Sequence, residues 1–251
     1  MREYVALARM RAIGVLLCHV LASPLFALDP RREVAQYALD TWGENEGLPG
    51  SYVYSILQTP DGYLWLGTRR GLARFDGVRF TVYDDRRPDQ LRDSEVVALA
   101  EDDDGTLWIA THNGWLTRLR NGAFTSHSLE AHSGNTIRAM VKPRGGPLWI
   151  GTSTGLVAFD GHRFDTYTTE HGLPGDSVTA LHADSHGTLW IGTTRGLASY
   201  AEGTFVDRTA LHPGLEGTIR TIAGGGDEVW LDGVLEEDAS VGGGTGQGLR
   251  R

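Results

Sequence analysis

The side chains in this sequence that could do chemistry are nine histidines, 32 acidic residues and a series of evenly spaced tryptophans. Histidines that lie together could hold a metal ion, but these nine fall at unrelated positions along the chain. No glycine-rich loop ends in a lysine, as a phosphate-binding loop would. No pair of carboxylates stands out as a general acid and base. We therefore expect no catalytic residue, no metal site and no cofactor, and a protein that is not an enzyme.

The tryptophans recur about every 41 residues, each after a leucine or a valine. They are Trp65, Trp108, Trp149, Trp190 and Trp230. Exposed rings at these positions could stack on sugars, whereas rings in the middle of strands would pack in a core. We expect the core. Aspartates before glycines, such as Asp61 and Asp76, could bind metal ions, but turn formation explains them better.

The surroundings of the tryptophans repeat as well, which predicts a repeat architecture. Leu64 to Thr68 is matched by Leu107 to Thr111, Leu148 to Thr152 and Leu189 to Thr193. The first unit contains four short apolar segments, and Asp-Gly turns separate two pairs of them. They are Val53 to Leu57, Tyr63 to Thr68, Leu72 to Phe75 and Val78 to Tyr83. Four antiparallel strands per unit indicate an all-β fold, a β-propeller with four complete blades and a partial fifth.

The ends of the chain set the predicted boundaries. Blades occupy residues 28–233, and Ala35 to Trp42 resembles a fourth strand that could help to close a ring. The pattern stops after Gly233, so residues 234–251 are predicted to be a disordered or frameshifted tail. An open arc is favoured over a closed ring of five blades. A natural flexible tail is the simpler alternative to a truncated reading frame.

Residues 1–27 read as a signal peptide, because three arginines precede an apolar run from Ala12 to Leu21. An uncleaved membrane anchor is the alternative. We expect export to the periplasm. The single cysteine, Cys18, lies in this segment, so no disulfide is expected in the mature part. The net charge of −9 would repel phosphate backbones, which argues against a nucleic-acid partner.

The repeat closely resembles that of the two-component-regulator propeller family. Residues 35–231 carry the resemblance, through Leu48-Pro49, the segment Asp61 to Thr68, Gly71-Leu72 and Phe75-Asp76-Gly77. It implies the periplasmic sensor region of a hybrid histidine kinase or diguanylate cyclase, apparently truncated. In such proteins seven-bladed propellers precede a β-sandwich, a membrane helix and a cytoplasmic output module. This sequence shows no sandwich, membrane helix or output module.

The resemblance therefore favours an extracytoplasmic ligand-sensing propeller without its output module. A propeller lyase or glycan hydrolase is one alternative, and an interaction scaffold or a truncated gene remnant is another. The expected partner is a small polar ligand or a glycan fragment. Membrane association would come through other regions of a longer parent or an uncleaved N-terminal segment, and a homodimer is a further option.

Candidate ligand-binding residues lie in polar loops that vary between repeats. The loop between the second and third strands should emerge on the same face as the loop that leads into the first strand. The candidates on this face are Arg69, Arg70, His112, Asn113 and Arg195. Arg138 and Arg220, on first strands, could point toward an axial channel. An ordinary solvated loop face remains the simpler alternative.

Overall fold

The computed structural model describes residues 40–129, 136–211, 215–225, 228–235 and 247–250. The chain divides into two compact units, Met1–Thr41 and Trp42–Arg251, and the strands that the structure describes belong to the second. The predicted signal peptide and most of the predicted closing strand lie outside the described residues. Within the described part, no helix is both long and apolar enough to cross a membrane.

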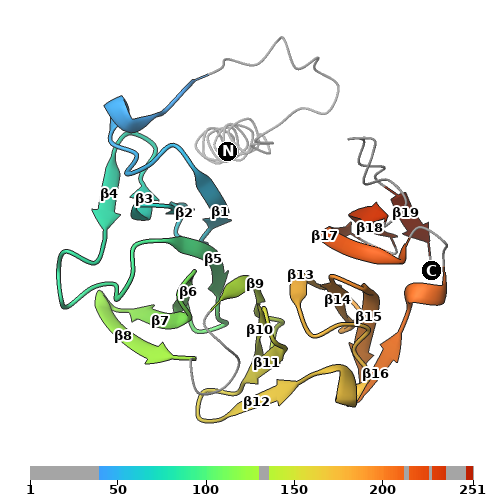
Figure 1. Cartoon of the computed structure of the whole chain (residues 1–251). Helices are drawn as coiled ribbons and strands as arrows, with labels where there is room; N and C mark the ends of the chain where they lie inside the picture. Colours follow the sequence, from blue (N-terminus) through green and yellow to red (C-terminus); the bar gives the residue numbers. More distant parts are fainter. Residues whose placement is uncertain (1–39, 130–135, 212–214, 226–227, 236–246, 251) are drawn as a thin grey trace, which may run out of the picture. The chain divides into compact units, whose positions relative to one another are not determined.

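The described part of the second unit forms five antiparallel sheets, called blades 1 to 5 in chain order (Figure 1). Blade 1 contains β1 (Val53–Gln58), β2 (Leu64–Thr68), β3 (Gly71–Phe75) and β4 (Phe80–Tyr83). Blade 2 contains β5 (Val96–Glu101), β6 (Leu107–Thr111), β7 (Trp115–Arg120) and β8 (Ala123–Ser128). Blade 3 contains β9 (Ile137–Val141), β10 (Leu148–Thr152), β11 (Leu156–Phe159) and β12 (Phe164–Tyr167).

Blade 4 contains β13 (Val178–Ala183), β14 (Leu189–Thr193), β15 (Gly196–Ala201) and β16 (Thr204–Asp207). Blade 5 contains β17 (Gly217–Gly225), β18 (Glu228–Leu235) and β19 (Gln247–Arg250). Short 3-10 helices precede blades 1, 4 and 5: η2 (Glu44–Glu46), η3 (Thr169–His171) and η4 (Thr209–Leu211). Strands pair in chain order within each blade. The predicted β-propeller, with four complete blades and a partial fifth, is confirmed.

The Asp-Gly pairs form the tight turns that the sequence predicts. Between β3 and β4, the Asp76 carboxylate accepts hydrogen bonds from the backbone N–H groups of Val78 and Arg79, at 2.8 and 2.7 Å. Asp160 does the same in blade 3. Gly77 has a φ of 97°, a conformation that glycine adopts without a steric penalty. Asp76 and Asp160 are therefore occupied by turn formation.

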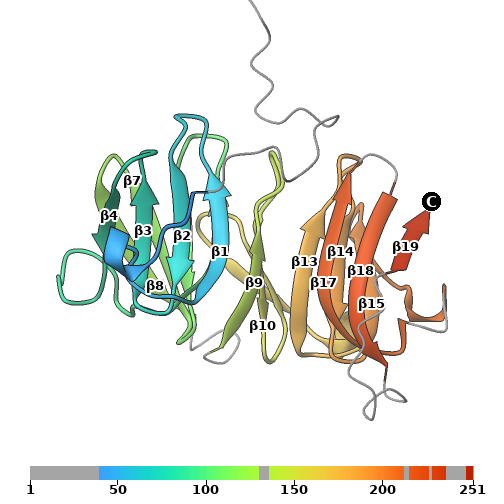
Figure 2. The same ribbon diagram turned by 90° about the horizontal axis from the view of Figure 1, so that it is seen from above.

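The first strand of a blade packs closely on the second strand of the blade before it. Gly67 in β2 has no side chain, and a Cβ added there would lie 2.8 Å from Val96 Cγ1 in β5. A Cβ on Gly192 in β14 would lie 2.9 Å from Ile219 Cβ in β17. Both β-branched residues are buried. Figure 2 shows the resulting arrangement, with β9, β13 and β17 side by side.

Aromatic rings join neighbouring blades further from the first strands. Trp108 in blade 2 meets Phe159 in blade 3 edge to face, with ring centroids 5.6 Å apart. Trp149 in blade 3 meets Tyr200 in blade 4 at 5.0 Å. The repeated tryptophans of blades 1 to 4 are all less than a tenth exposed, so the predicted core role is confirmed for them. Trp230, in blade 5, is 54% exposed.

Strands occupy residues 234–235 and 247–250, which lie in the tail (234–251) predicted to be disordered or frameshifted. Strand β18 continues to Leu235, and β19 pairs with it antiparallel from Glu228↔Arg250 to Leu231↔Gln247. This pairing gives backbone partners to the edge of β18. The intervening residues 236–246, which include most of the glycine-rich stretch, lie outside the described residues. Backbone pairing needs no apolar alternation, which is why the sequence pattern did not reveal β19.

Replacing Gly151 with valine tests the close contact between first and second strands. A Cβ at this position would lie 2.7 Å from Val178 Cγ1, so we expect Gly151→Val to lower the free energy of unfolding by about 3 kcal/mol. Urea denaturation followed by tryptophan fluorescence measures this change. Gly146→Val is the control, because the nearest atom to a Cβ there is 3.5 Å away. Equal losses in the two variants would contradict this account of the contact.

Candidate ligand-binding surface

The turns that carry the predicted ligand-binding residues are fixed to the loops that lead into the first strands. The backbone N–H of Arg69 donates to the carbonyl of Tyr52 at 3.2 Å, and that of His112 donates to Glu95 at 2.8 Å. Blades 3 and 4 repeat this bond between Ser153 and Thr136 and between Thr194 and Ser177. The predicted shared face of these two sets of loops is therefore confirmed.

A buried threonine shapes three of these turns from inside. Thr193 Oγ1 donates to the carbonyl of Gly196 at 3.0 Å and accepts the N–H of Arg195 at 3.1 Å. Thr68 and Thr152 make the same pair of bonds in blades 1 and 3. Thr111 departs from the pattern in blade 2, where its buried Oγ1 has no hydrogen-bond partner among the described residues. Three turns therefore present their polar side chains on the same rigid support.

Arg69 and Arg70 lie together in a pocket of about 450 Å³, which we call the loop-face pocket. Its other lining residues are Pro49, Val82, Asp84, Asp85, Arg86 and Ser94. The Arg86 Nε donates to Asp84 Oδ2 at 2.7 Å, and this bond holds the pKa of that carboxyl below its ordinary value. Arg70 forms an ion pair with Glu44, with 3.7 Å between Arg70 Nη1 and Glu44 Oε2. Arg69 forms no ion pair with any residue that the structure describes, so its guanidinium is available to a ligand.

The other predicted residues lie on equivalent turns or strands and do not line the loop-face pocket. His112 and Asn113 are exposed between β6 and β7, and Arg195 is exposed between β14 and β15. Arg138 and Arg220 are exposed on β9 and β17. Each of these two arginines sits at an irregularity in the pairing of its strand, a β-bulge that recurs in the first strand of every blade. The structure thus brings together two of the seven candidates.

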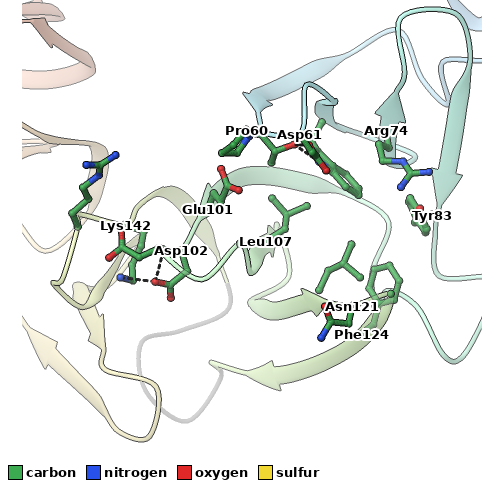
Figure 3. A pocket seen from close by; sticks show the side chains of 17 residues that line it. Pro60, Asp61, Arg74, Tyr83, Glu101, Asp102, Leu107, Asn121, Phe124 and Lys142 are labelled. Atoms are coloured by element: carbon green, nitrogen blue, oxygen red, sulfur yellow. Dashed lines mark hydrogen bonds and ion pairs between the residues drawn. The ribbon is translucent and has the colours of Figure 1, made fainter.

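A larger pocket, of about 830 Å³, lies where the Asp-Gly turns of blades 1 and 2 meet the start of blade 3 (Figure 3). We call it the seam pocket. Its walls include the aromatic residues Trp65, Tyr83 and Phe124, and its charged residues include Glu101 and Lys142. None of the seven residues predicted from the sequence lines this pocket, because they lie on the opposite set of loops or on first strands. The available signal was Leu119, which stands where blades 1, 3 and 4 have an aromatic residue.

Two short segments match the sequences of known catalytic or metal-binding motifs but do not have the secondary structure that those motifs need. His182 and His186 are four residues apart, but the first lies in β13 and the second in the turn after it, so they do not share a helix face. Gly151 to Gly155 has the letters of a nucleophile elbow around Ser153, but it joins two strands instead of a strand and a helix. No group of three or more potential metal ligands occurs within the described ranges.

Three stretches of the chain match the two component regulator propeller family: residues 47–70, 90–113 and 172–195. In blades 1, 2 and 4 each match runs from the loop before the first strand to the turn after the second. The three matches end at Arg70, Asn113 and Arg195. The resemblance found in the sequence is therefore confirmed for these three stretches, each of which matches the two component regulator propeller repeat.

One curated relative is Histidine kinase P4 from Formosa agariphila, 35% identical over 74 residues, which are 30% of this chain and 5% of that protein. Among solved structures, the extracellular domain of the one component system BT4673 from B. thetaiotaomicron has a TM-score of 0.62 and 21% identity. That match covers 74% of this chain and 26% of the other. The chain thus spans a small part of both proteins.

A second solved structure, virginiamycin B lyase from Staphylococcus aureus, has a TM-score of 0.61 and 13% identity. The match covers 82% of this chain and 72% of the lyase. At these identities the two structural matches show a shared propeller fold and nothing about activity.

Replacing the buried threonine of blade 4 tests whether it holds the turn. Thr193→Val leaves the N–H of Arg195 and the carbonyl of Gly196 without their partner, so we expect a loss of about 1–3 kcal/mol in the free energy of unfolding. The matched control is Thr111→Val, which removes a hydroxyl that has no partner in the described part of the chain. That variant should unfold at the same or a higher urea concentration than the unmodified chain. A Thr111→Val loss as large as that of Thr193→Val would refute the assignment.

Proposed function

Because parts of three blades match the two component regulator propeller repeat, we propose that the chain is an extracytoplasmic ligand-binding propeller, the input part of a signalling receptor. The observation that carries this proposal is the match of three repeats to that family, each ending at a turn with a predicted binding residue. The similarity to a histidine kinase supports a role in signal transduction. In this proposal the chain binds and does not catalyse.

The loop-face pocket is the proposed binding site. Arg69 and Arg70 belong to one of the turns that are fixed to the loop before the first strand. A turn held in this way can offer its side chains to a ligand with little ordering cost. The exposed guanidinium of Arg69 favours a small polar ligand with a carboxylate or several hydroxyl groups. We do not expect nucleic acid, because the chain carries a net charge of −9.

The proposed location is the periplasm. Two observations support it: the arginine-containing apolar segment in residues 1–27 and the extracellular origin of a solved domain with the same fold. The phosphorylating or second-messenger output would come from other parts of a receptor, since the described blades contain no such module.

A ligand screen on the purified chain tests the proposal. We expect a subset of sugars and organic acids to raise the thermal unfolding midpoint, and the effect to grow with ligand concentration. For a ligand that raises it, Arg69→Ala should weaken binding about tenfold in calorimetric titration, because a charge-assisted hydrogen bond is lost.

Arg79→Ala is the matched control, since Arg79 is exposed in the same blade but lies in the turn between β3 and β4. It should leave the affinity unchanged. The proposal would be contradicted if the chain is well folded and no compound in a broad screen raises its thermal unfolding midpoint. Equal effects of Arg69→Ala and Arg79→Ala would remove the loop-face pocket as its site.

A further inference from the structure

The seam between blades 2 and 3 is closed by an ion pair and an aromatic ring. Lys142, the only lysine of the chain, places its Nζ 2.9 Å from Asp102 Oδ1, and the lysine side chain is only 10% exposed. Nearby, Phe159 packs against Trp108. Blade 3 thus supplies an ammonium group and an aromatic ring that contact Asp102 and Trp108 of blade 2.

The seam between blades 1 and 2 has neither group at the equivalent positions. Glu101 occupies the place of Lys142, since each lies five residues after the buried β-branched residue that opens its first strand. Leu119 occupies the place of Phe159, since each pairs with the leucine that precedes the tryptophan of its blade. Blade 2 therefore presents a carboxylate and a smaller apolar side chain where blade 3 presents an ammonium group and a ring.

The seam pocket is the space that these two replacements leave. Trp65 and Tyr83, stacked with centroids 6.0 Å apart, line it from blade 1, and Phe124, 5.4 Å from Tyr83, lines it from blade 2. Its volume of about 830 Å³ is within the usual range for small-molecule sites. Aromatic walls of this kind favour a flat apolar ring.

Negative charge without a counter-ion lies at one side of the pocket. Glu101 and Asp61 both line it, and neither forms an ion pair with a described residue. Burial, and then the neighbouring charge of Asp61, raise the pKa of the Glu101 carboxyl above its ordinary value. A cation bound between the two carboxylates would remove this repulsion.

The cations that line the pocket have other contacts. Lys142 is paired with Asp102, and it also donates to the carbonyl of Pro143 at 3.4 Å. The guanidinium of Arg74 lies over the ring of Tyr63, 4.5 Å from its centroid. Arg144, the remaining basic residue, lies in the turn of blade 3. None of them forms an ion pair with Glu101 in the part of the chain that the structure describes.

We propose that the seam pocket binds a small primary amine that carries an aromatic ring, with the ring against Trp65, Tyr83 and Phe124 and the ammonium group between Glu101 and Asp61. Such a ligand supplies to this seam the two groups that Lys142 and Phe159 supply to the next one. The site lies among the Asp-Gly turns, so it is separate from the loop-face pocket and does not depend on the proposed function.

Calorimetric titration of the purified chain with phenethylamine tests the proposal. We expect saturable binding that is at least about tenfold tighter than binding of 3-phenylpropionate, which has the ring but a carboxylate, or of n-butylamine, which has the amine but no ring. Glu101→Gln should weaken phenethylamine binding about tenfold, because the amide keeps the shape and loses the charge.

Two further variants supply the missing groups from the chain itself. Glu101→Lys places an ammonium group where blade 3 has one, and Leu119→Phe places a ring where blade 3 has one, so each should abolish phenethylamine binding. Circular dichroism and the thermal unfolding midpoint show whether each variant is folded. Glu170→Gln, an exposed carboxylate in η3, is the control and should bind as the unmodified chain does.

The proposal fails if phenethylamine does not bind, or if it binds no better than 3-phenylpropionate and n-butylamine. It also fails if folded Glu101→Lys and Leu119→Phe variants keep the unmodified affinity. Such a failure does not affect the proposed binding site in the loop-face pocket, because the two pockets are separate. For the same reason, Arg69→Ala should not change phenethylamine binding. Conversely, if the chain binds phenethylamine but no sugar or organic acid, the seam pocket is a binding site and the loop-face proposal fails.

Discussion

The close contact between a glycine and a β-branched residue of the next blade is the constraint on which the fold depends. Gly67, Gly151 and Gly192 sit near the ends of second strands, and Val96, Val178 and Ile219 fill the space that a side chain would need. The contact fixes the distance between neighbouring first strands. It also explains why the sequence repeats so faithfully at this point: the backbones approach closely, and few side chains fit.

Blade 2 shows how much variation the constraint permits. It has Ala110 where the other complete blades have glycine, and this residue is fully buried. The same blade has Leu119 in place of a ring, and its Thr111 lacks the hydrogen bonds of the equivalent threonines. These departures cluster in the blade that borders the seam pocket. A repeat protein can concentrate change in one unit because the other seams hold the fold together.

Much of the fold was predictable from the sequence because the repeat reports on backbone geometry. Trp65 and Asp76 recur with their neighbours at fixed spacing, so strands, turns and blade number followed directly. Strand β19 was not predictable, since backbone pairing leaves no apolar pattern. The binding surface was predictable only in part. Loop alternation placed Arg69 and Arg70 on one face, but the chain's folding decides which loops share a pocket. The seam pocket lies where Glu101 and Leu119 stand in place of an ammonium group and a ring, and residue types that do chemistry give no signal for a missing ring.

The substantial contacts between blades in the described part join consecutive blades only. Stability in such an arrangement approximates a sum of terms for single units and terms for nearest-neighbour interfaces. Blade 3 has a neighbour on both sides, whereas blade 5, with Trp230 half exposed, has a described neighbour on one. Amide hydrogen exchange should therefore be slower in blade 3 than in blade 5, as expected when unfolding begins at an end of the array of blades. The proposed amine contacts residues of blades 1 and 2, so its binding would add to the interface term of those two blades and slow the opening of the seam between them.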